Sequence, residues 1–206
     1  MKKNSVFLRA FEPDDYVLIN KWRNDFDVQK NVVGRFRYVS KEIEKNWVYS
    51  KATNNQTDVY LAICINDESK RMIGYTSIND IDYVNRKASM GGIVMAGDSH
   101  NIKNLTDAYL LLFDFVFVDL SLHRLDGVFL SDYDNAFLMN TMIGWTFEGK
   151  ERDSIFKNQR FYDLYRISML ENEYFDLLNN GGFEYQAMKE RYRNARKSMK
   201  ESQQNM

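Results

Sequence analysis

The first part of the chain shows hydrophobic positions in a strand-like and then a helical pattern. The segment "SVFLRA" predicts a short strand, and "FEPDDYVLINKWRND" predicts a helix whose first turn holds Pro13 and two aspartates. A second helix, "SKEIEKNWVYSKA", is expected after Ser40. Within it Ile43, Trp47 and Ser50 share a face at helical spacing.

The period of the pattern then changes to two. Three strands are predicted, "DVYLAICIN", "RMIGYTSINDID" and "KASMGGIVMA", joined by the polar turns "DESK" and "YVNR". We expect them to form an antiparallel meander. A nearly all-apolar helix is predicted from Thr106 to Asp119, and such a helix must be covered on most sides.

The strand "HRLDGVFL", the short helix "NAFLMNTMI" and two strands, "WTFEGKE" and "RFYDLYRISML", are predicted next, the last two around a polar loop. Residues 88–130 read as strand, helix, strand, which is the natural place for a parallel crossover. The predicted fold class is therefore α/β (α+β), with a mixed, mostly antiparallel sheet of six to seven strands and helices on both faces.

The composition shifts from Glu171 onward. "ENEYFDLLNN" predicts a short helix that ends at Gly181 and Gly182. A longer charged helix follows, whose narrow apolar stripe consists of Tyr185, Met188, Tyr192, Ala195 and Met199. We expect a main domain at 1–170 and a helical extension at 171–206. The extension either lies on its own domain or forms a homodimer or partner contact, and both readings stay open.

Bulk properties exclude several function classes. The formal net charge of −1 over 206 residues favours neither nucleic acid nor an anionic membrane as partner. One cysteine cannot form an internal disulfide, and with two histidines it makes a poor metal inventory, so we expect no metal. The N-terminal segment lacks a long apolar stretch, and no window reaches the length of a membrane-spanning helix. We therefore expect a cytoplasmic protein.

Four segments together carry a resemblance to a known family. They are "FLRAFEPDDYVLINKWRND", "MIGYTSINDID", "GWTFEGKERD", with Trp145 where a phenylalanine is usual, and "FYDLYRISML". In order and spacing they resemble the GNAT acetyltransferases, in the branch that acetylates ribosomal-protein N-termini and amino sugars. The resemblance covers roughly residues 4 to 170. It implies an N-acetyltransferase that uses acetyl-CoA as co-substrate and a primary amine as acceptor.

The resemblance also implies a place for acetyl-CoA. The strand residues Ile93, Val94 and Met95 would bond through their backbone to the pantetheine arm. This requires the strand to part from its parallel neighbour, and Gly91-Gly92 in mid-strand suits a β-bulge with that effect. A bulge that only bends the sheet is the alternative. The loop and helix start would hold the pyrophosphate, and this region spans His100, Asn101, Ile102, Lys103, Asn104, Leu105 and Thr106.

That loop lacks the glycines of the family pattern. Aligned on "TDA", the family's conserved loop positions fall on His100, Lys103 and Leu105, and a shift of one residue moves them to Asn101, Asn104 and Thr106. Asparagine tolerates left-handed φ best among the non-glycine residues, which favours the shifted register. Lys103 and His100 would add positive charge. The loop either still holds the coenzyme or belongs to a weakened site.

Acetyl transfer to an amine calls for a base, an oxyanion donor and an acid for the departing thiolate. The resemblance implies the N–H near Val94 as oxyanion donor. The family's strand glutamate falls on Ser89 and its tyrosine on Asn140. Asp80 is a candidate base, although it and Asp82 could equally cap a turn. Tyr133 and Tyr162 are candidate acids, or packing residues, and Asn135 could hold the coenzyme arm.

The acceptor side is predicted at the face lined by the first two helices and the polar hairpin loop "RDSIFKNQ". Arg35 and Arg37 beside Trp47 suit an acidic or phosphorylated acceptor such as a nucleotide-linked amino sugar. A solvated basic loop is the alternative reading, and a protein N-terminus remains open as acceptor. The rival to the enzyme is a non-catalytic binding or assembly module that keeps the fold with a degenerate coenzyme site.

Overall fold

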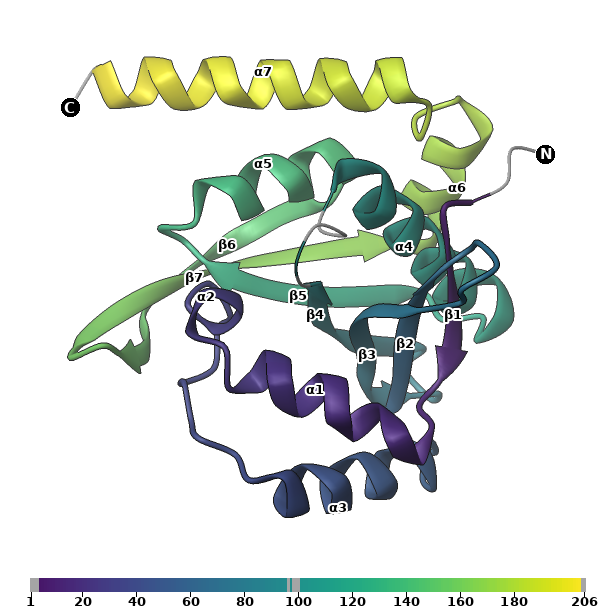
Figure 1. Cartoon of the computed structure of the whole chain (residues 1–206). Coiled ribbons are helices and arrows are strands. Elements are labelled where there is room, and N and C mark those ends of the chain that lie inside the picture. The colour runs from purple at the N-terminus through teal and green to yellow at the C-terminus, as the bar shows by residue number, and fades with distance from the viewer. Residues whose placement is uncertain (1–3, 96, 98–100, 205–206) are drawn as a thin grey trace. The chain divides into compact units, whose positions relative to one another are not determined.

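The computed structural model describes residues 4–95, 97 and 101–204, with the side chains of 202–204 left out. The chain divides into two compact units, the first ending at Leu122 and the second beginning at His123 (Figure 1). Each unit is built around its own group of strands. The predicted boundary at residue 170 stays a prediction.

The first unit contains a four-stranded antiparallel sheet. Its strands are β1 (Val6–Ala10), β2 (Val59–Ile65), β3 (Met72–Asp82) and β4 (Lys87–Met95), paired in chain order. The period-two segments of the sequence thus form the predicted meander. Bonded strand pairs satisfy the backbone, so the two faces of the sheet are left to the side chains.

One face of this sheet is covered by the helices that precede β2 (Figure 1). After the short 3₁₀ turn η1 (Pro13–Asp15) they are α1 (Tyr16–Arg23), α2 (Phe26–Gln29) and α3 (Lys41–Ala52). Ile19 and Trp22 of α1 and Val48 of α3 are buried with Phe11 and Ala62. The side chain of Ser40 caps α3 as predicted, accepting from the Ile43 N–H at 3.3 Å.

The other face is covered by α4 (Ile102–Asp114), which a π-helical turn, η3 (Phe115–Asp119), continues. Ala108 of α4 packs in a cluster with Ile63, Ile73 and Met95 of the sheet. The predicted start at Thr106 was wrong, because the helix begins one turn earlier, at Ile102. The first turn is polar apart from Ile102 and Leu105, so the hydrophobic pattern did not reveal it.

A β-bulge interrupts β4, as the glycine pair predicted. Thr76 lies opposite Ile93 while Ile78 lies opposite Met90, so β4 holds one extra residue. Gly92 has a left-handed φ of 78°, and its carbonyl accepts a hydrogen bond from Thr76 Oγ1 at 2.8 Å. A Cβ on Gly91 would lie 2.0 Å from Ser77 Oγ. Gly92 is therefore favoured by its backbone conformation, and Gly91 by the Ser77 side chain that lies against it.

The second unit contains a three-stranded antiparallel sheet. Its strands are β5 (Arg124–Leu130), β6 (Thr146–Lys157) and β7 (Arg160–Leu170), with β7 between the other two. The segment "RDSIFKNQ" was expected as a polar loop, but most of it continues β6. Only Asn158 and Gln159 turn the chain, at φ of 51° and 61°. Within either unit every strand pair is antiparallel, in agreement with the predicted mostly antiparallel α/β fold class.

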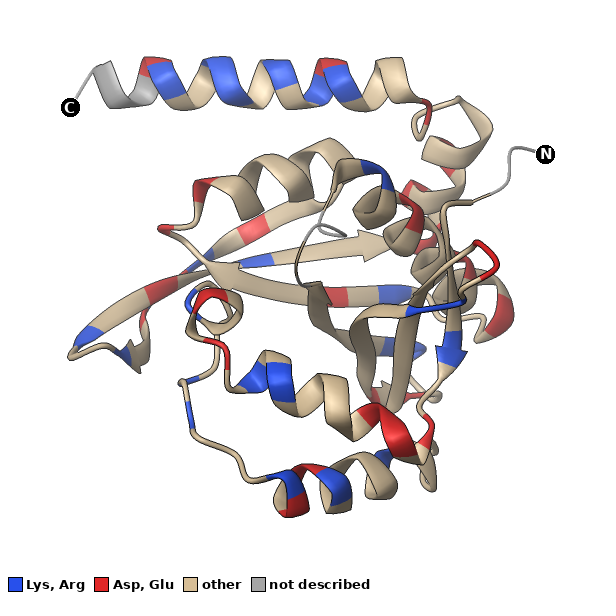
Figure 2. Ribbon diagram, in the orientation of Figure 1, with Lys and Arg blue, Asp and Glu red and all other residues tan. Residues whose placement is uncertain are grey.

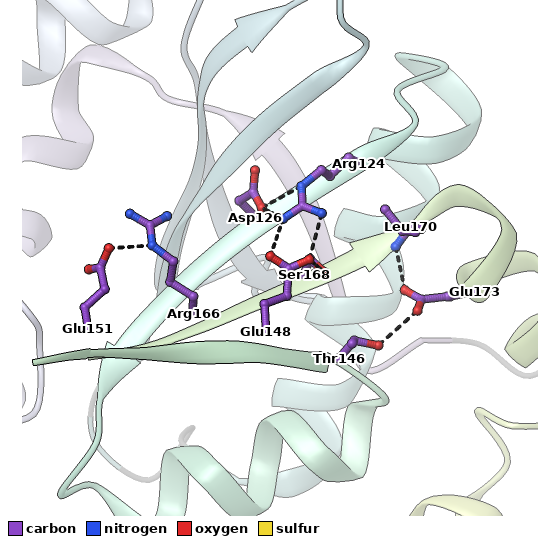
Figure 3. Close-up of polar contacts among 9 residues, drawn as sticks. All are labelled: Arg124, Asp126, Thr146, Glu148, Glu151, Arg166, Ser168, Leu170 and Glu173. Atoms are coloured by element: carbon purple, nitrogen blue, oxygen red, sulfur yellow. Dashed lines mark hydrogen bonds and ion pairs between the residues drawn. The ribbon is translucent and has the colours of Figure 1, made fainter. Parts of the chain in front are cut away.

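The two faces of the second sheet differ in character. The helix α5 (Asp134–Ile143) contributes Phe137 to an aromatic cluster with Phe129, Phe147 and Tyr165. Residues of the other parity point to the opposite face, which carries ion pairs (Figure 3). Arg124 of β5 donates to both oxygens of Glu148 on β6, at 2.8 and 2.6 Å. This bidentate pair ties the outer strands together across β7.

The C-terminal segment forms two helices, α6 (Glu171–Asn179) and α7 (Tyr185–Gln204). Gly181, at φ 67°, follows α6 as predicted. Arg191 of α7 donates to the Met142 carbonyl of α5 at 3.0 Å, and Met188 and Ala195 are buried. Figure 2 shows the remaining length of α7 rich in Lys and Arg. The helix thus packs on its own unit, and the homodimer contact stays a prediction.

The bulge makes a prediction about stability. The variant Gly91→Ala should lower the free energy of unfolding by about 1–3 kcal/mol, because the new methyl group collides with Ser77. Urea denaturation measures this. Gly149→Ala in β6 is the matched control, since a Cβ there meets no atom within 4 Å, and it should change stability by less than about 0.5 kcal/mol. Equal effects of the two substitutions would contradict the account.

The bidentate pair makes a prediction about pH. Hydrogen bonds from Arg124 and Ser168 lower the pKa of Glu148 from 4.5 to about 2. Its contribution is therefore complete above pH 4.5 and is lost as the pH falls toward 2. Glu148→Gln should cost up to about 1 kcal/mol at neutral pH, since the pair is partly exposed, and progressively less as the pH falls to 2. Urea denaturation across this range tests it, with Glu68→Gln in the β2–β3 turn as control. A pH-independent difference would refute it.

Candidate functional site

The segment Ile93–Met95 directly follows the bulge. In the ladder with β3, Ile93 lies opposite Thr76, Val94 opposite Tyr75 and Met95 opposite Gly74. Ile93 and Met95 belong to the core cluster beneath α4, so the alternating Val94 faces the α1 and α3 side. A Cβ at position 74 would lie 2.3 Å from the Val94 carbonyl oxygen. The close approach of β3 fixes the main chain at the predicted coenzyme segment.

The start of α4 is organised by Asn101. Its side chain accepts from the Asn104 N–H at 2.9 Å and its carbonyl from the Leu105 N–H at 3.0 Å. Asn101 has an extended φ of −123°. Asn104 lies within the helix, so the left-handed φ that favoured the shifted register is not found at this residue. Among the residues described near this turn, Gly97 has a left-handed φ of 65°. His100 lies outside the described residues.

The other predicted loop residues differ in exposure. Ile102 is half exposed, Leu105 packs against the core cluster under α4, and Asn104 is buried. Thr106 is also buried, and its hydroxyl donates to the Lys103 carbonyl at 3.0 Å. The first turn of α4 therefore offers its main-chain N–H groups rather than these side chains.

Lys103 forms an ion pair with Asp107 one turn later, at 3.1 Å. Asp107 also accepts from the N–H and the hydroxyl of Ser5, at 2.6 and 2.7 Å. Burial raises the pKa of Asp107, but these hydrogen bonds outweigh it and leave the pKa below its usual value. About half of the Lys103 side chain is exposed, so its charge at the helix start is shared between Asp107 and solvent.

The candidate base Asp80 lies in an exposed bulge at the end of β3. It has a left-handed φ of 53°, and its N–H donates to Asp58 Oδ1 at 3.2 Å. Asp82 accepts from the N–H and the amide of Asn85, at 2.9 and 2.6 Å, which confirms the turn-capping alternative for that residue. A catalytic role for Asp80 stays a prediction.

The candidate acids and Asn135 belong to the second unit. Tyr133 is half-buried at the start of α5, where its carbonyl accepts from the Ala136 N–H at 2.9 Å, and Asn135 is exposed in the first turn. Tyr162 is half-buried on β7. The Arg160 guanidinium lies 4.1 Å from the centre of the Tyr162 ring and pairs with Asp132 at 2.9 Å. Tyr162 therefore has a fixed cationic neighbour.

On the predicted acceptor side, the arginine that contacts Trp47 is neither of the two expected from the sequence. Arg35 and Arg37 are both exposed in the segment between α2 and α3. Trp47 is half-buried, and the arginine that lies on its ring is Arg23, at 3.8 Å. Arg23 was not among the predicted acceptor-side residues, because it lies on another helix than Trp47 and is distant from it in the sequence.

Arg23 is paired with a buried carboxylate, Glu44 of α3. The two charges are 3.2 Å apart, and Glu44 has no exposed surface. Neither of its oxygens accepts a hydrogen bond from the residues that the structure describes. Burial raises the pKa of Glu44, and the neighbouring Arg23 opposes this shift. Ile43 shares a face with Trp47 as predicted but is exposed, so the buried face of α3 carries Glu44 and Val48 instead.

Within the described part of the chain, no helix has both the length and the apolar character needed to cross a membrane.

Comparison with known proteins identifies relatives of this chain. The acetyltransferase (GNAT) domain family matches residues 5–135. A protein of Bacillus subtilis (strain 168) named as a ribosomal N-acetyltransferase, YdaF, is 29% identical over 103 residues, which are 50% of this chain and 56% of that protein. The match thus spans only about half the length of this relative.

Solved structures resemble the whole fold. The spermidine N-acetyltransferase of Vibrio cholerae, in complex with CoA and spermine, superposes with a TM-score of 0.74 at 21% identity, covering 83% of this chain and 98% of that chain. A point mutant of that enzyme gives a TM-score of 0.71 at 22% identity, covering 83% and 96%. At this identity the likeness shows the fold. Together with the family match, it confirms the resemblance drawn from the sequence: this chain belongs to the acetyltransferase (GNAT) domain family.

Proposed function

We propose that this chain is an acetyl-CoA-dependent N-acetyltransferase that acts on a primary amine. The observation that carries the proposal is the bulge at Gly91-Gly92, which leads into Ile93–Met95 and then into the start of α4. A bulged strand followed by a helix N-terminus places main-chain donors in succession. A thioester-linked coenzyme with a pyrophosphate needs such donors along its length.

The residues present fit acetyl-CoA, because they offer main-chain hydrogen-bonding groups along its length and one cationic side chain, Lys103, at the start of α4. Ile93, Val94 and Met95 would hold the pantetheine arm, and the role predicted for Asn135, in the second unit, stays a prediction. The pyrophosphate would lie at the first N–H groups of α4, those of Ile102 and Lys103, because Asn101 already occupies the N–H of Asn104. Gly97, which precedes α4, has the left-handed φ of 65° that glycine adopts without strain.

The chemistry then needs three contributions from the chain. The coenzyme supplies the acetyl group as a thioester, and the neutral amine nitrogen bonds to its carbonyl carbon as the carbon–sulfur bond breaks. The N–H near Val94 would donate to the carbonyl oxygen as it gains charge. Tyr133 would give its hydroxyl proton to the departing thiolate, and the amine would release its proton to Asp80 or to solvent.

The rival proposal is a non-catalytic module of the same fold. It is favoured by Ser89 and Asn140, which stand where the family carries an acid and a tyrosine, and Asn140 is buried. A module of this kind could retain the strand geometry while losing the coenzyme. Binding of acetyl-CoA is therefore the property that separates the two proposals.

Acetyl-CoA should stabilise the folded chain. At a concentration 100 times its dissociation constant, the gain is about 2.7 kcal/mol. For a chain of this length that raises the melting temperature by about 5–10 °C. Thermal denaturation with and without the coenzyme measures the effect, and desulfo-CoA and adenosine serve as controls. An unchanged melting temperature at millimolar acetyl-CoA would reject the enzyme in favour of the non-catalytic module.

Tyr133 should act as the acid. Tyr133→Phe should lower kcat by about 100-fold with an unchanged KM for acetyl-CoA, because general acid catalysis contributes that order of rate. Tyr162→Phe, whose ring is held by Arg160, should lose less than about 3-fold. Release of CoA is followed with a thiol reagent, and the exposed Tyr83→Phe is the control. Full activity of the Tyr133 variant would exclude this role.

A further inference from the structure

The Arg23 guanidinium is the accessible end of an otherwise buried ion pair. Its side chain is 27% exposed, whereas that of Glu44 is not exposed at all. The guanidinium carbon lies 3.8 Å from the centre of the Trp47 ring. One Nη of Arg23 thus lies 3.2 Å from a Glu44 oxygen as an ion pair, and the Trp47 ring supports the plane of the guanidinium. The charge that this cluster presents to solvent is positive.

Stability alone does not account for this pair. Burying a carboxylate costs several kcal/mol, and hydrophobic replacements of buried ion pairs are often neutral or stabilising. Among the described residues Glu44 accepts no hydrogen bond that would offset the cost. What the pair does achieve is to fix an arginine that would otherwise sample many rotamers. A pre-oriented guanidinium is the form that recognises oxyanions best.

Arg23 lies on the predicted acceptor side, the face of the first sheet that carries Val94, α1 and α3. Tyr75 is directly opposite Val94 in the ladder, so their side chains share a face. The Tyr75 ring packs against Trp22 with centroids 6.2 Å apart, beneath α1. Burial raises the pKa of the Tyr75 hydroxyl, and the nearby Arg23 charge opposes this shift. Tyr75 therefore has Arg23 near its hydroxyl and Val94 opposite it in the ladder, which relates the arginine to the predicted coenzyme segment.

We propose that Arg23 binds an anionic group of the acceptor, so that the preferred substrate is a primary amine that also carries a phosphate or a carboxylate. Glu44 and Trp47 are positioning residues that orient the guanidinium. This inference rests on the proposed N-acetyltransferase function and narrows its substrate class. It separates this chain from the Vibrio cholerae spermidine N-acetyltransferase, which was solved in complex with spermine. A polyamine carries only positive charge, and Arg23 of this chain would repel it.

The test compares neutral and anionic amines of similar shape. Glucosamine is paired with glucosamine 6-phosphate, and ethanolamine with β-alanine, so that the two pairs distinguish phosphate from carboxylate. Spermidine is the polycationic probe. The wild-type chain should show kcat/KM about 10- to 100-fold higher for the anionic member of at least one pair, as expected for hydrogen bonds between charged groups. Spermidine should be the poorest acceptor.

Variants assign the preference to Arg23. Arg23→Gln should raise KM for the anionic amine about 10-fold or more, leave the neutral amine within about 2-fold, and keep the melting shift caused by acetyl-CoA. Because this change strands a buried carboxylate, the double variant Arg23→Gln with Glu44→Gln is made as well. It should fold and show the same loss. Exposed residues give the controls, Glu42→Gln on α3 and Arg193→Gln on α7.

The outcomes separate the two proposals. Equal use of neutral and anionic amines, a preference for spermidine, or equal losses on both amines in the Arg23 variants would overturn the inference while leaving the acetyltransferase proposal intact.

If no amine is acetylated but acetyl-CoA binds, a binding experiment decides. It measures the shift in melting temperature that glucosamine 6-phosphate or β-alanine produces in the presence of CoA. A shift lost in the double variant supports the inference, and an absent or unchanged shift overturns it. Failure of acetyl-CoA to bind overturns both proposals.

Discussion

The bulge in β4 is the constraint on which the candidate site depends. Glycine at position 91 permits the bulge, because any Cβ there would collide with Ser77. Gly92 adopts a left-handed φ, and Thr76 donates a hydrogen bond to its carbonyl. One extra residue shifts the register for everything that follows in the strand. The main chain at Ile93–Met95 and the direction in which the chain leaves for α4 both follow from it.

The acceptor face depends on a second set of contacts, made by the end of α1. Asn24 donates to the Val39 carbonyl at 2.9 Å and accepts from the Val39 N–H at 2.9 Å, and Asn20 donates to the same carbonyl at 2.7 Å. These bonds fix the segment that leads into α3. They thereby set where Glu44 and Trp47 of α3 lie relative to Arg23, the last residue of α1. A single packed layer thus carries both core residues and the proposed recognition group.

Much of the fold could be predicted from local sequence, because local chemistry determined it. Ser40 capped α3, the glycine pair formed the bulge, and period-two patterns formed the meander. The start of α4 was missed because Asn101 acts as a cap, a role that hydrophobic periodicity does not reveal. The length of β6 was missed because Asp153, at φ 50°, sits in a bulge whose polar residues resemble a loop.

The candidate site was less predictable, because its decisive contacts join distant segments. Burial of Glu44 contradicts the usual rule that charges are solvated, and only the position of Arg23 on another helix explains it. Sequence proximity pointed to Arg35 and Arg37 instead. The coenzyme segment was easier, since Ile93–Met95 follows the bulge along the chain. The pairing of Tyr75 with Val94, which relates the two regions, requires the sheet register.

The most direct measurement of the central claim is a backbone amide NMR titration with acetyl-CoA. If the bulged strand holds the coenzyme through its main chain, the amide signals of Gly92 to Met95 and of Ile102 and Lys103 should shift together and saturate with one dissociation constant. Amides of β1, and of α7 in the second unit, should remain in place. Saturable binding that leaves the Gly92 to Met95 amides unshifted would contradict the account.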